Sequence, residues 1–135
     1  MTYKIEEVEG IGPAYAEKLA TVGIQTTDDF LKHCADAQGR KTIAAKTDIS
    51  EKRILTWANL ADLTRLKGIG PQYAEMLEAA GVDTVKELRH RNAENLAAKM
   101  KEVNDAKNLA NATPAASVIE GWIAEAKNTE PTITH

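Results

Sequence analysis

Apolar residues recur along much of the chain at the three- and four-residue spacing that is typical of one face of a helix. The clearest stripe consists of Ile54, Trp57, Ala58 and Ala61, which fall at positions i, i+3, i+4 and i+7 of one segment. Short clusters of glycine, proline, serine and threonine separate such segments, as expected for turns and helix ends. The pattern therefore predicts an all-helical protein.

The first half of the chain is predicted to form a series of short helices and one long one. Gly23 suits the end of a helix, whereas Thr26 or Thr27 and Ser50 suit helix starts. Gln38-Gly39 is expected to break the chain before the next helix. The predicted helices cover residues 5–8, 13–22, 28–34, 40–46 and 51–66.

The second half repeats this plan. Its predicted helices cover residues 71–80 and 84–91, segments within 92–109, and a last helix that Thr113 caps and Pro114 begins. The last helix carries an apolar stripe of its own, Ile119, Trp122, Ile123 and Ala126, at an offset of 65 residues from the first stripe. Since the offset elsewhere is 58 residues, about seven residues are inserted in the second half, between Ala93 and Ala112.

An internal repeat underlies this plan. The ten residues from Gly10, GIGPAYAEKL, return almost unchanged from Gly68 as GIGPQYAEML, 58 positions later. A fixed internal spacing means that the same packing problem is solved twice, so the chain is expected to hold two copies of one unit.

The repeated segment predicts a tight turn that leads into a helix. Two glycines permit positive φ and close backbone approach, and Pro13 or Pro71 suits the first turn of the next helix. Ile11 and Ile69 are expected to point into the core. The free N–H groups and the positive dipole end at such a helix start favour an anion such as phosphate.

The sequence resembles a known motif at this point. The pattern Ile5-x-x-Val8-x-Gly-Ile-Gly-Pro-x-x-Ala-x-x-Leu19 resembles the helix-hairpin-helix motif of DNA repair and recombination proteins. In those proteins the hairpin amides hold the phosphates of a duplex without reading its bases. Over nearly its full length the chain is similar to a family of small two-repeat proteins known only as a domain of unknown function.

The resemblance implies a fold and a domain plan. We expect two tandem helix-hairpin-helix units of the SAM-like type that share a connecting helix. The units are expected to span residues 1–62 and 63–128, with a flexible tail over 129–135, where periodicity is absent.

The candidate binding residues follow from the same resemblance and from clusters of basic side chains. Asp48-Ile49-Ser50 lies between two predicted helices and resembles a degenerate hairpin, surrounded by basic residues. The candidates for contact with a nucleic-acid backbone are Gly68, Ile69, Gly70, Arg65, Lys67 and Arg89 at the second hairpin, Gly10 and Gly12 at the first, and Lys46 and Arg53 beside the degenerate turn.

Charge makes this assignment uneven. The net charge of −3 is unlike that of a strongly basic nucleic-acid-binding protein. Glu6, Glu7 and Glu9 precede the first hairpin and repel phosphate, so the second hairpin is expected to be the better site. DNA or another polyanion is one expected partner. The alternative is a protein partner, with both glycine turns purely structural.

Composition argues against other chemistry. Cys34 is the only cysteine and its neighbour His33 faces another side of the helix, so no nucleophile, zinc site or cofactor site is expected. The chain has neither a signal-peptide pattern nor an apolar run of membrane-spanning length, which predicts a cytoplasmic protein that does not contact membranes. Tyr15 and Tyr73 are expected to pack rather than stack on a ligand. An enzymatic function is not expected.

Overall fold

The computed structural model describes residues 2–134, and within them the only regular elements are helices. An isolated bridge joins Lys4 to Thr26. The elements are a 3₁₀ helix η1 (Ile5–Glu7) and the α-helices α1 (Pro13–Ala20), α2 (Thr27–Cys34), α3 (Ala37–Thr47), α4 (Glu51–Leu63), α5 (Pro71–Ala79), α6 (Val85–Leu88), α7 (Ala93–Lys107) and α8 (Ala116–Lys127). The predicted all-α fold class is confirmed for this part of the chain.

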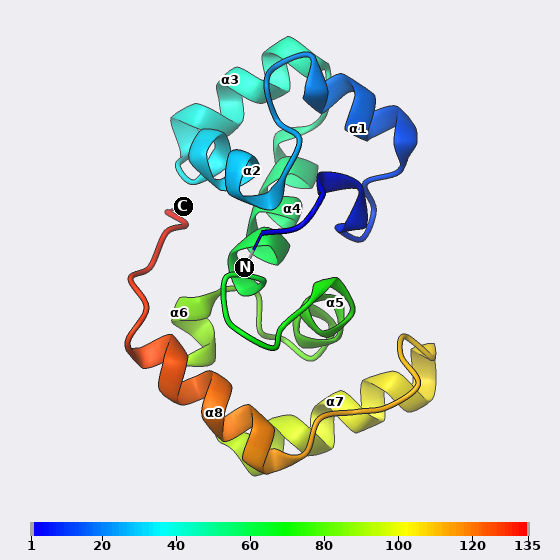
Figure 1. The fold of residues 1–135 in the computed structure, drawn as a ribbon, viewed down its shortest axis with the longest axis vertical. Helices are drawn as coiled ribbons and strands as arrows, with labels where there is room; N and C mark the ends of the chain where they lie inside the picture. Colours follow the sequence, from blue (N-terminus) through cyan, green and yellow to red (C-terminus); the bar gives the residue numbers. More distant parts are fainter. Residues whose placement is uncertain (1, 135) are drawn as a thin grey trace.

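Helix α4 joins two groups of helices. It packs against α2 and α3 on one side of the molecule and against α5 on the other, while α7 packs against α8 (Figure 1). Residues 57–64 of α4 and its end are buried without interruption, as expected for a helix that is enclosed by neighbours. One continuous apolar core runs through both groups. No helix among residues 2–134 is long and apolar enough to cross a lipid bilayer.

Side-chain caps set most helix starts. Thr26 accepts a hydrogen bond from the N–H of Asp29 at 3.1 Å, and the Asp29 carboxylate accepts one from the N–H of Thr26 at 3.2 Å. Backbone N–H donors, that of Gln25 first among them, hold the pKa of Asp29 below its ordinary value. Thr84 caps α6 in the same way, by accepting from the N–H of Glu87.

The start of α3 differs from the prediction. The helix begins at Ala37 rather than after Gly39, because the Asp36 carboxylate accepts a hydrogen bond from the N–H of Gly39 at 2.7 Å. Gly39 therefore lies inside the first turn. A side-chain cap outweighs the weak helix propensity of a single glycine.

The last helix also differs from the prediction. It begins at Ala116, after an extended Ala115 that provides no side-chain cap, so Thr113 and Pro114 precede it.

Helix α4 ends at Leu63, before the predicted end at Leu66. The predicted insertion is divided between two places: α7 has 15 residues where α3 has 11, and the connection after α7 is longer than the one after α3.

The C-terminal segment returns to the first group of helices (Figure 1). The N–H of Thr134 donates to the carbonyl of Ala35 at 2.9 Å, and Ile133 is 8% exposed. The sequence predicted a flexible tail here because no periodicity marks it. The structure shows extended chain held by backbone hydrogen bonding, an interaction that leaves no helical pattern in a sequence.

Candidate nucleic-acid interface

The two glycine turns have the same backbone conformation. Gly10 and Gly68 both have φ of +91°, in the region that side chains disfavour. Gly12 and Gly70 are the caps before α1 and α5 and are extended, with φ of −83° and −87°. The first glycine of each turn thus adopts the positive φ that the sequence permits, and the second does not.

Ile11 and Ile69, between the glycines, are 3% and 0% exposed, which confirms that they point inward. The middle residue of each turn is thus packed in the core, while the flanking glycines are exposed or partly exposed. Pro13 and Pro71 occupy the first turns of α1 and α5, as predicted.

A tryptophan supports each turn at the same place. A side chain at Gly10 would place its Cβ 3.0 Å from Nε1 of Trp57, and one at Gly68 would place it 3.1 Å from Nε1 of Trp122. The indoles also contact tyrosines, with ring centroids 5.1 Å apart for Tyr15 and Trp57. The corresponding separation for Tyr73 and Trp122 is 5.4 Å. The equivalent burial of the two tryptophans is confirmed.

A third turn has similar geometry without glycine. Asp48 is left-handed with φ of +60°, Ile49 is buried, and Ser50 caps α4 by accepting a hydrogen bond from the N–H of Arg53 at 3.2 Å. The order of a left-handed residue, a buried isoleucine and a helix cap is the order found in the glycine turns. Asp48 adopts a conformation that aspartate tolerates better than most residues.

The first glycine turn and this third turn meet at one hollow. Its volume is about 380 Å³, and it is lined by Glu9, Gly10, Ser50, Lys52, Arg53, Thr56 and Trp57. The guanidinium of Arg53 lies over the ring of Tyr15, 5.3 Å from its centroid, and donates a hydrogen bond to the Tyr15 hydroxyl. Lys52 and Arg53 remain exposed. The start of α4, the first glycine of the Gly10 turn and two cations therefore line a single concave surface.

Lys46 does not line the hollow that Lys52 and Arg53 line. It lines a different hollow with Lys32, beside Thr21 and Val22 at the far end of α1. The basic cluster that the sequence shows around Asp48 is thus divided between two surfaces, and only Lys52 and Arg53 face the glycine turn.

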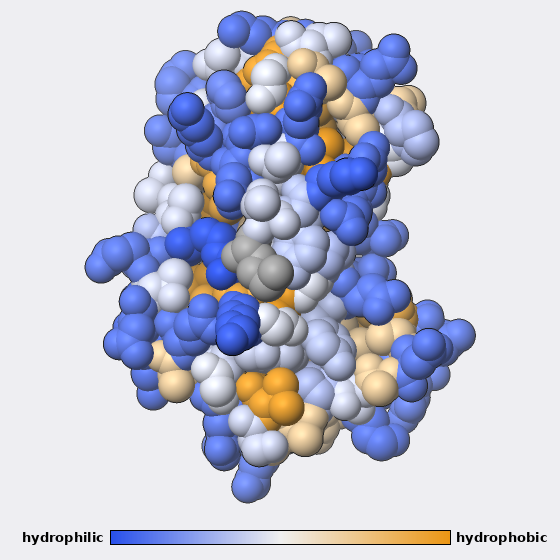
Figure 2. Space-filling model, viewed as in Figure 1, coloured by the Kyte–Doolittle hydropathy of each residue, from blue (hydrophilic) through white to orange (hydrophobic). Residues whose placement is uncertain are grey.

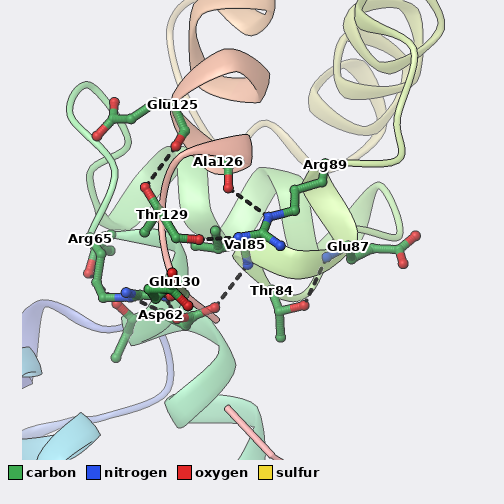
Figure 3. A network of polar contacts seen from close by, with 12 residues as sticks. Asp62, Arg65, Thr84, Val85, Glu87, Arg89, Glu125, Ala126, Thr129 and Glu130 are labelled. Atoms are coloured by element: carbon green, nitrogen blue, oxygen red, sulfur yellow. Dashed lines mark hydrogen bonds and ion pairs between the residues drawn. The ribbon is translucent and has the colours of Figure 1, made fainter. Parts of the chain in front are cut away.

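Arg65 is used within the fold (Figure 3). Its Nε donates to the buried carboxylate of Asp62 at 2.9 Å, and its guanidinium donates to the carbonyl of Glu130 at 3.0 Å. Asp62, in turn, accepts from the N–H of Val85 at 2.9 Å and so fixes the start of α6. These partners hold the Arg65 guanidinium against α4 and the C-terminal segment.

Arg89 is also used within the fold. Its Nε donates to the carbonyl of Ala126 at 2.7 Å and its guanidinium to the carbonyl of Thr129, at the C-terminal end of α8 (Figure 3). A cation at this end of a helix is favoured by the helix dipole. The Lys67 side chain is exposed, but its N–H donates to both oxygens of the Glu125 carboxylate, each at 3.2 Å.

The second turn lacks the cations of the first. Matching Trp57 with Trp122 places Ser117 and Val118 where Lys52 and Arg53 stand. Among the described residues, Val118 is the only large hydrophobic side chain that is exposed, at 47%. Sequence reasoning missed this difference, although the offset of 65 residues between the tryptophan stripes carries the signal.

Carboxylates gather where the two units meet. Partial burial and the neighbouring Glu9 carboxylate raise the pKa of Glu75, which lies on α5. A negative region of this kind repels phosphate from the space between the units. Within residues 2–134 the structure has no cluster of three or more acidic, histidine or cysteine side chains arranged to hold a metal ion.

Within residues 2–134 the fold is all-helical, with two glycine turns of the same backbone conformation on either side of α4. Residues 9–129 match the family described as a domain of unknown function, DUF4332, and the chain belongs to that family. No curated protein and no solved structure gives a significant match to the chain.

Proposed function

We propose that this protein is a non-catalytic module that binds the phosphate backbone of a nucleic acid, independently of sequence, through its first unit. The observation that carries the proposal is the hollow where the Gly10 turn and the Asp48 turn meet beside Lys52 and Arg53. In this proposal the two turns act as a paired helix-hairpin-helix site.

The chemistry of this hollow suits phosphate oxygens. Helix α4 starts at it, since its cap Ser50 lines the hollow, and the first N–H groups of a helix have no partner within the helix. The dipole of α4 adds partial positive charge at the same place. Lys52 and Arg53 supply full positive charge with several donors, and Arg53 is already oriented by Tyr15. Such contacts position a backbone but carry no base code.

The proposed site is in the first unit because the cations near the second turn have other roles. Arg65 and Arg89 donate to groups of the protein itself, which leaves Lys67 as the exposed cation there. Gly68, Ile69 and Gly70 keep the right turn geometry for a second contact, but Glu125 already accepts from the N–H of Lys67.

Affinity is expected to be low. Glu9 lines the same hollow, and the net charge of the chain is −3. If the first unit engages about two or three phosphates, the slope of log affinity against log salt is expected to be about −2 to −3 for a duplex, at about −0.9 per phosphate.

Fluorescence anisotropy with duplex, single-stranded and branched DNA of several sequences, from about 50 to about 200 mM salt, tests the proposal. The expected result is weak, sequence-insensitive binding that falls with salt at the slope above. Absence of binding to all three DNA forms at the lowest salt would overturn it.

A pair of charge-reversal variants locates the site. Lys52→Glu with Arg53→Glu is expected to abolish binding and its salt dependence, because both cations line the hollow. Lys99→Glu with Lys101→Glu changes the net charge equally but lies on α7, where both lysines form exposed ion pairs. Equal losses in the two double variants would indicate nonspecific attraction and contradict the assignment.

A second candidate function is assembly with a protein. The observation that favours it is Val118, exposed on α8, where Figure 2 shows apolar side chains at the surface. An apolar interface at α8 would be insensitive to salt, unlike phosphate contacts. Sedimentation of the protein alone and with Val118→Glu tests whether α8 mediates association between copies.

A further inference from the structure

A large concave surface lies at the mouth of the second glycine turn. It has a volume of about 700 Å³, which is within the range of small-molecule sites. The cleft is lined by Glu7, Gly68, Gly70, Pro71, Gln72, Tyr73, Ala110, Asn111 and Ala112. Its walls thus come from both units and from the long connection between α7 and α8.

Most of the wall is apolar and includes one aromatic ring. Tyr73 is half-buried, and its ring is tilted at 54° against Trp122, which holds it in place. Pro71, Ala110 and Ala112 supply further small apolar surface. The amide side chains of Gln72 and Asn111 are the neutral polar groups of the lining.

The one charged side chain of the lining is the carboxylate of Glu7. One of its oxygens accepts a hydrogen bond from the N–H of Lys4 at 3.0 Å, which fixes the carboxylate at the end of η1. None of the nine lining residues is lysine, arginine or histidine. The cleft is therefore negative at its rim.

Neighbouring groups strengthen this negative character. The Glu125 carboxylate occupies the N–H of Lys67, directly before Gly68. Glu75, on α5 like Gln72 and Tyr73, lies next to the Glu9 carboxylate. An anion brought to this cleft would meet the Glu7 carboxylate and no lysine or arginine of the lining, whereas Lys52 and Arg53 offset Glu9 in the hollow at the first turn.

We propose that this cleft binds a small organic cation, an amine, amidine or guanidinium group on a flat apolar body. The cationic group pairs with Glu7, and the apolar body packs against Tyr73, Pro71 and the two alanines. The face of the Tyr73 ring adds a cation–π contact. The proposal is independent of phosphate binding, since it concerns a different cleft, at the second glycine turn, and the opposite charge.

Three ring compounds of nearly equal shape test the proposal: benzamidine, which is cationic, benzamide, which is neutral, and benzoate, which is anionic. Each is titrated into the isotope-labelled full chain, and the N–H shifts of Gly68, Gly70 and Asn111 are followed, with Gly10 as an internal control. We expect benzamidine to bind at least about tenfold more tightly than benzoate, with benzamide between them, as charge pairing at a partly exposed site implies.

Two variants locate the charge and the cavity. Glu7→Gln keeps an oxygen that can accept from the N–H of Lys4 but removes the charge, and is expected to weaken benzamidine binding about fivefold to tenfold while leaving benzamide unchanged. Glu6→Gln, on the same 3₁₀ helix and outside the cleft lining, is the matched control and is expected to have no effect. Ala112→Phe, in the exposed connection, is expected to fill the cleft and abolish binding.

The proposal is overturned if benzoate binds as tightly as benzamidine, or if benzamidine leaves the shifts of Gly68 and Gly70 unchanged at about 10 mM, a concentration above the weakest specific affinities. It is also overturned if Gly10 responds as strongly as Gly68, or if Ala112→Phe binds benzamidine normally. The Ala112→Phe result decides the matter should Glu7→Gln disturb the fold.

Discussion

The guanidinium of Arg40 donates a hydrogen bond of 2.6 Å to the carbonyl of Thr134, across 94 positions of sequence. The same guanidinium donates to the carbonyls of Cys34 and Ala35, at the end of α2. Arg40 is 5% exposed. One buried cation therefore joins the end of the chain to the first unit and provides hydrogen bonds for carbonyl groups that no helix satisfies.

Replacing Arg40 by methionine is expected to lower the free energy of unfolding by about 2–3 kcal/mol, because the carbonyls of Cys34 and Thr134 lose the Arg40 donor while the apolar part of the side chain is kept. Urea unfolding measures the change. Arg53→Met, at an exposed arginine, is the control and is expected to change stability by less than about 0.5 kcal/mol. Similar losses in both variants would contradict the role of Arg40.

The two glycines of each turn are expected to respond differently to alanine. Gly68→Ala should cost about 1–3 kcal/mol, because φ is +91° and the new Cβ would lie 3.1 Å from Trp122. Gly12→Ala should change stability by no more than about 0.5 kcal/mol, because φ is −83° and its Cβ would meet no atom within 4 Å among the described residues. Thermal unfolding of both variants distinguishes them, and equal costs would disprove this account.

Gly12 also offers a test of binding without a change in stability. Since a side chain fits there, Gly12→Val is expected to stay folded and to weaken DNA binding by occupying the approach to the first turn. Gly70 is the equivalent residue of the second unit, so Gly70→Val is the matched control and is expected to leave DNA affinity unchanged. Anisotropy measures both affinities, and a loss confined to Gly70→Val would place the phosphate site in the second unit.

Cys34 is expected to be unreactive in the native protein. Burial disfavours the thiolate and raises the pKa of Cys34 to about 12, so almost none of the reactive form exists near pH 8. Labelling with a thiol reagent should be slow in buffer and fast in concentrated urea. Complete labelling within seconds under native conditions would show that the thiol is accessible.

Glu75 is expected to make stability depend on pH. Its pKa in the folded protein is raised above the ordinary value of 4.5, by burial first and then by Glu9. The folded state therefore retains this proton more strongly than the unfolded state does, and the stability associated with it is present below pH 4.5 and lost as pH rises through the folded pKa.

Glu75→Gln should accordingly be more stable than the parent protein at pH 7, with a difference that shrinks as pH falls toward 4.5. Glu17→Gln, the exposed equivalent on α1, is the control and should show no such trend. Urea unfolding over this pH interval measures both. The prediction would be contradicted if Glu75→Gln gained less stability over the parent protein at pH 7 than at pH 4.

Local signals in the sequence predict the turns and most helices. Two glycines with a following proline, a threonine three residues before an acid, and tryptophans on apolar stripes each depend on neighbouring residues alone, and Pro13, Thr26 and Trp57 take the expected places. Gly39 was predicted wrongly although its signal is also local, because the Asp36 cap three residues before it outweighs the weak helix propensity of glycine.

The functional roles of charged residues were harder to predict, because their partners are distant in sequence. Arg65 and Arg89 have the position of phosphate ligands beside the second turn, but Glu130 and Thr129 approach them only when α8 and the C-terminal segment pack. The pairing of Gly10 with Ser50 is likewise tertiary. Composition indicates that such cations exist, and only the packed structure indicates which of them face solvent.

The backbone hydrogen bond between Thr134 and Ala35 also determines how the chain bears force. Both ends of the described chain are attached to the first unit, since Tyr3 bonds to Thr27 near one end and Thr134 to Ala35 near the other. A force applied to the two ends is therefore carried first by these two attachments. The second unit bears no force until the attachment between Thr134 and Ala35 breaks. Tethered by both ends, the molecule would present its second unit as an unloaded loop.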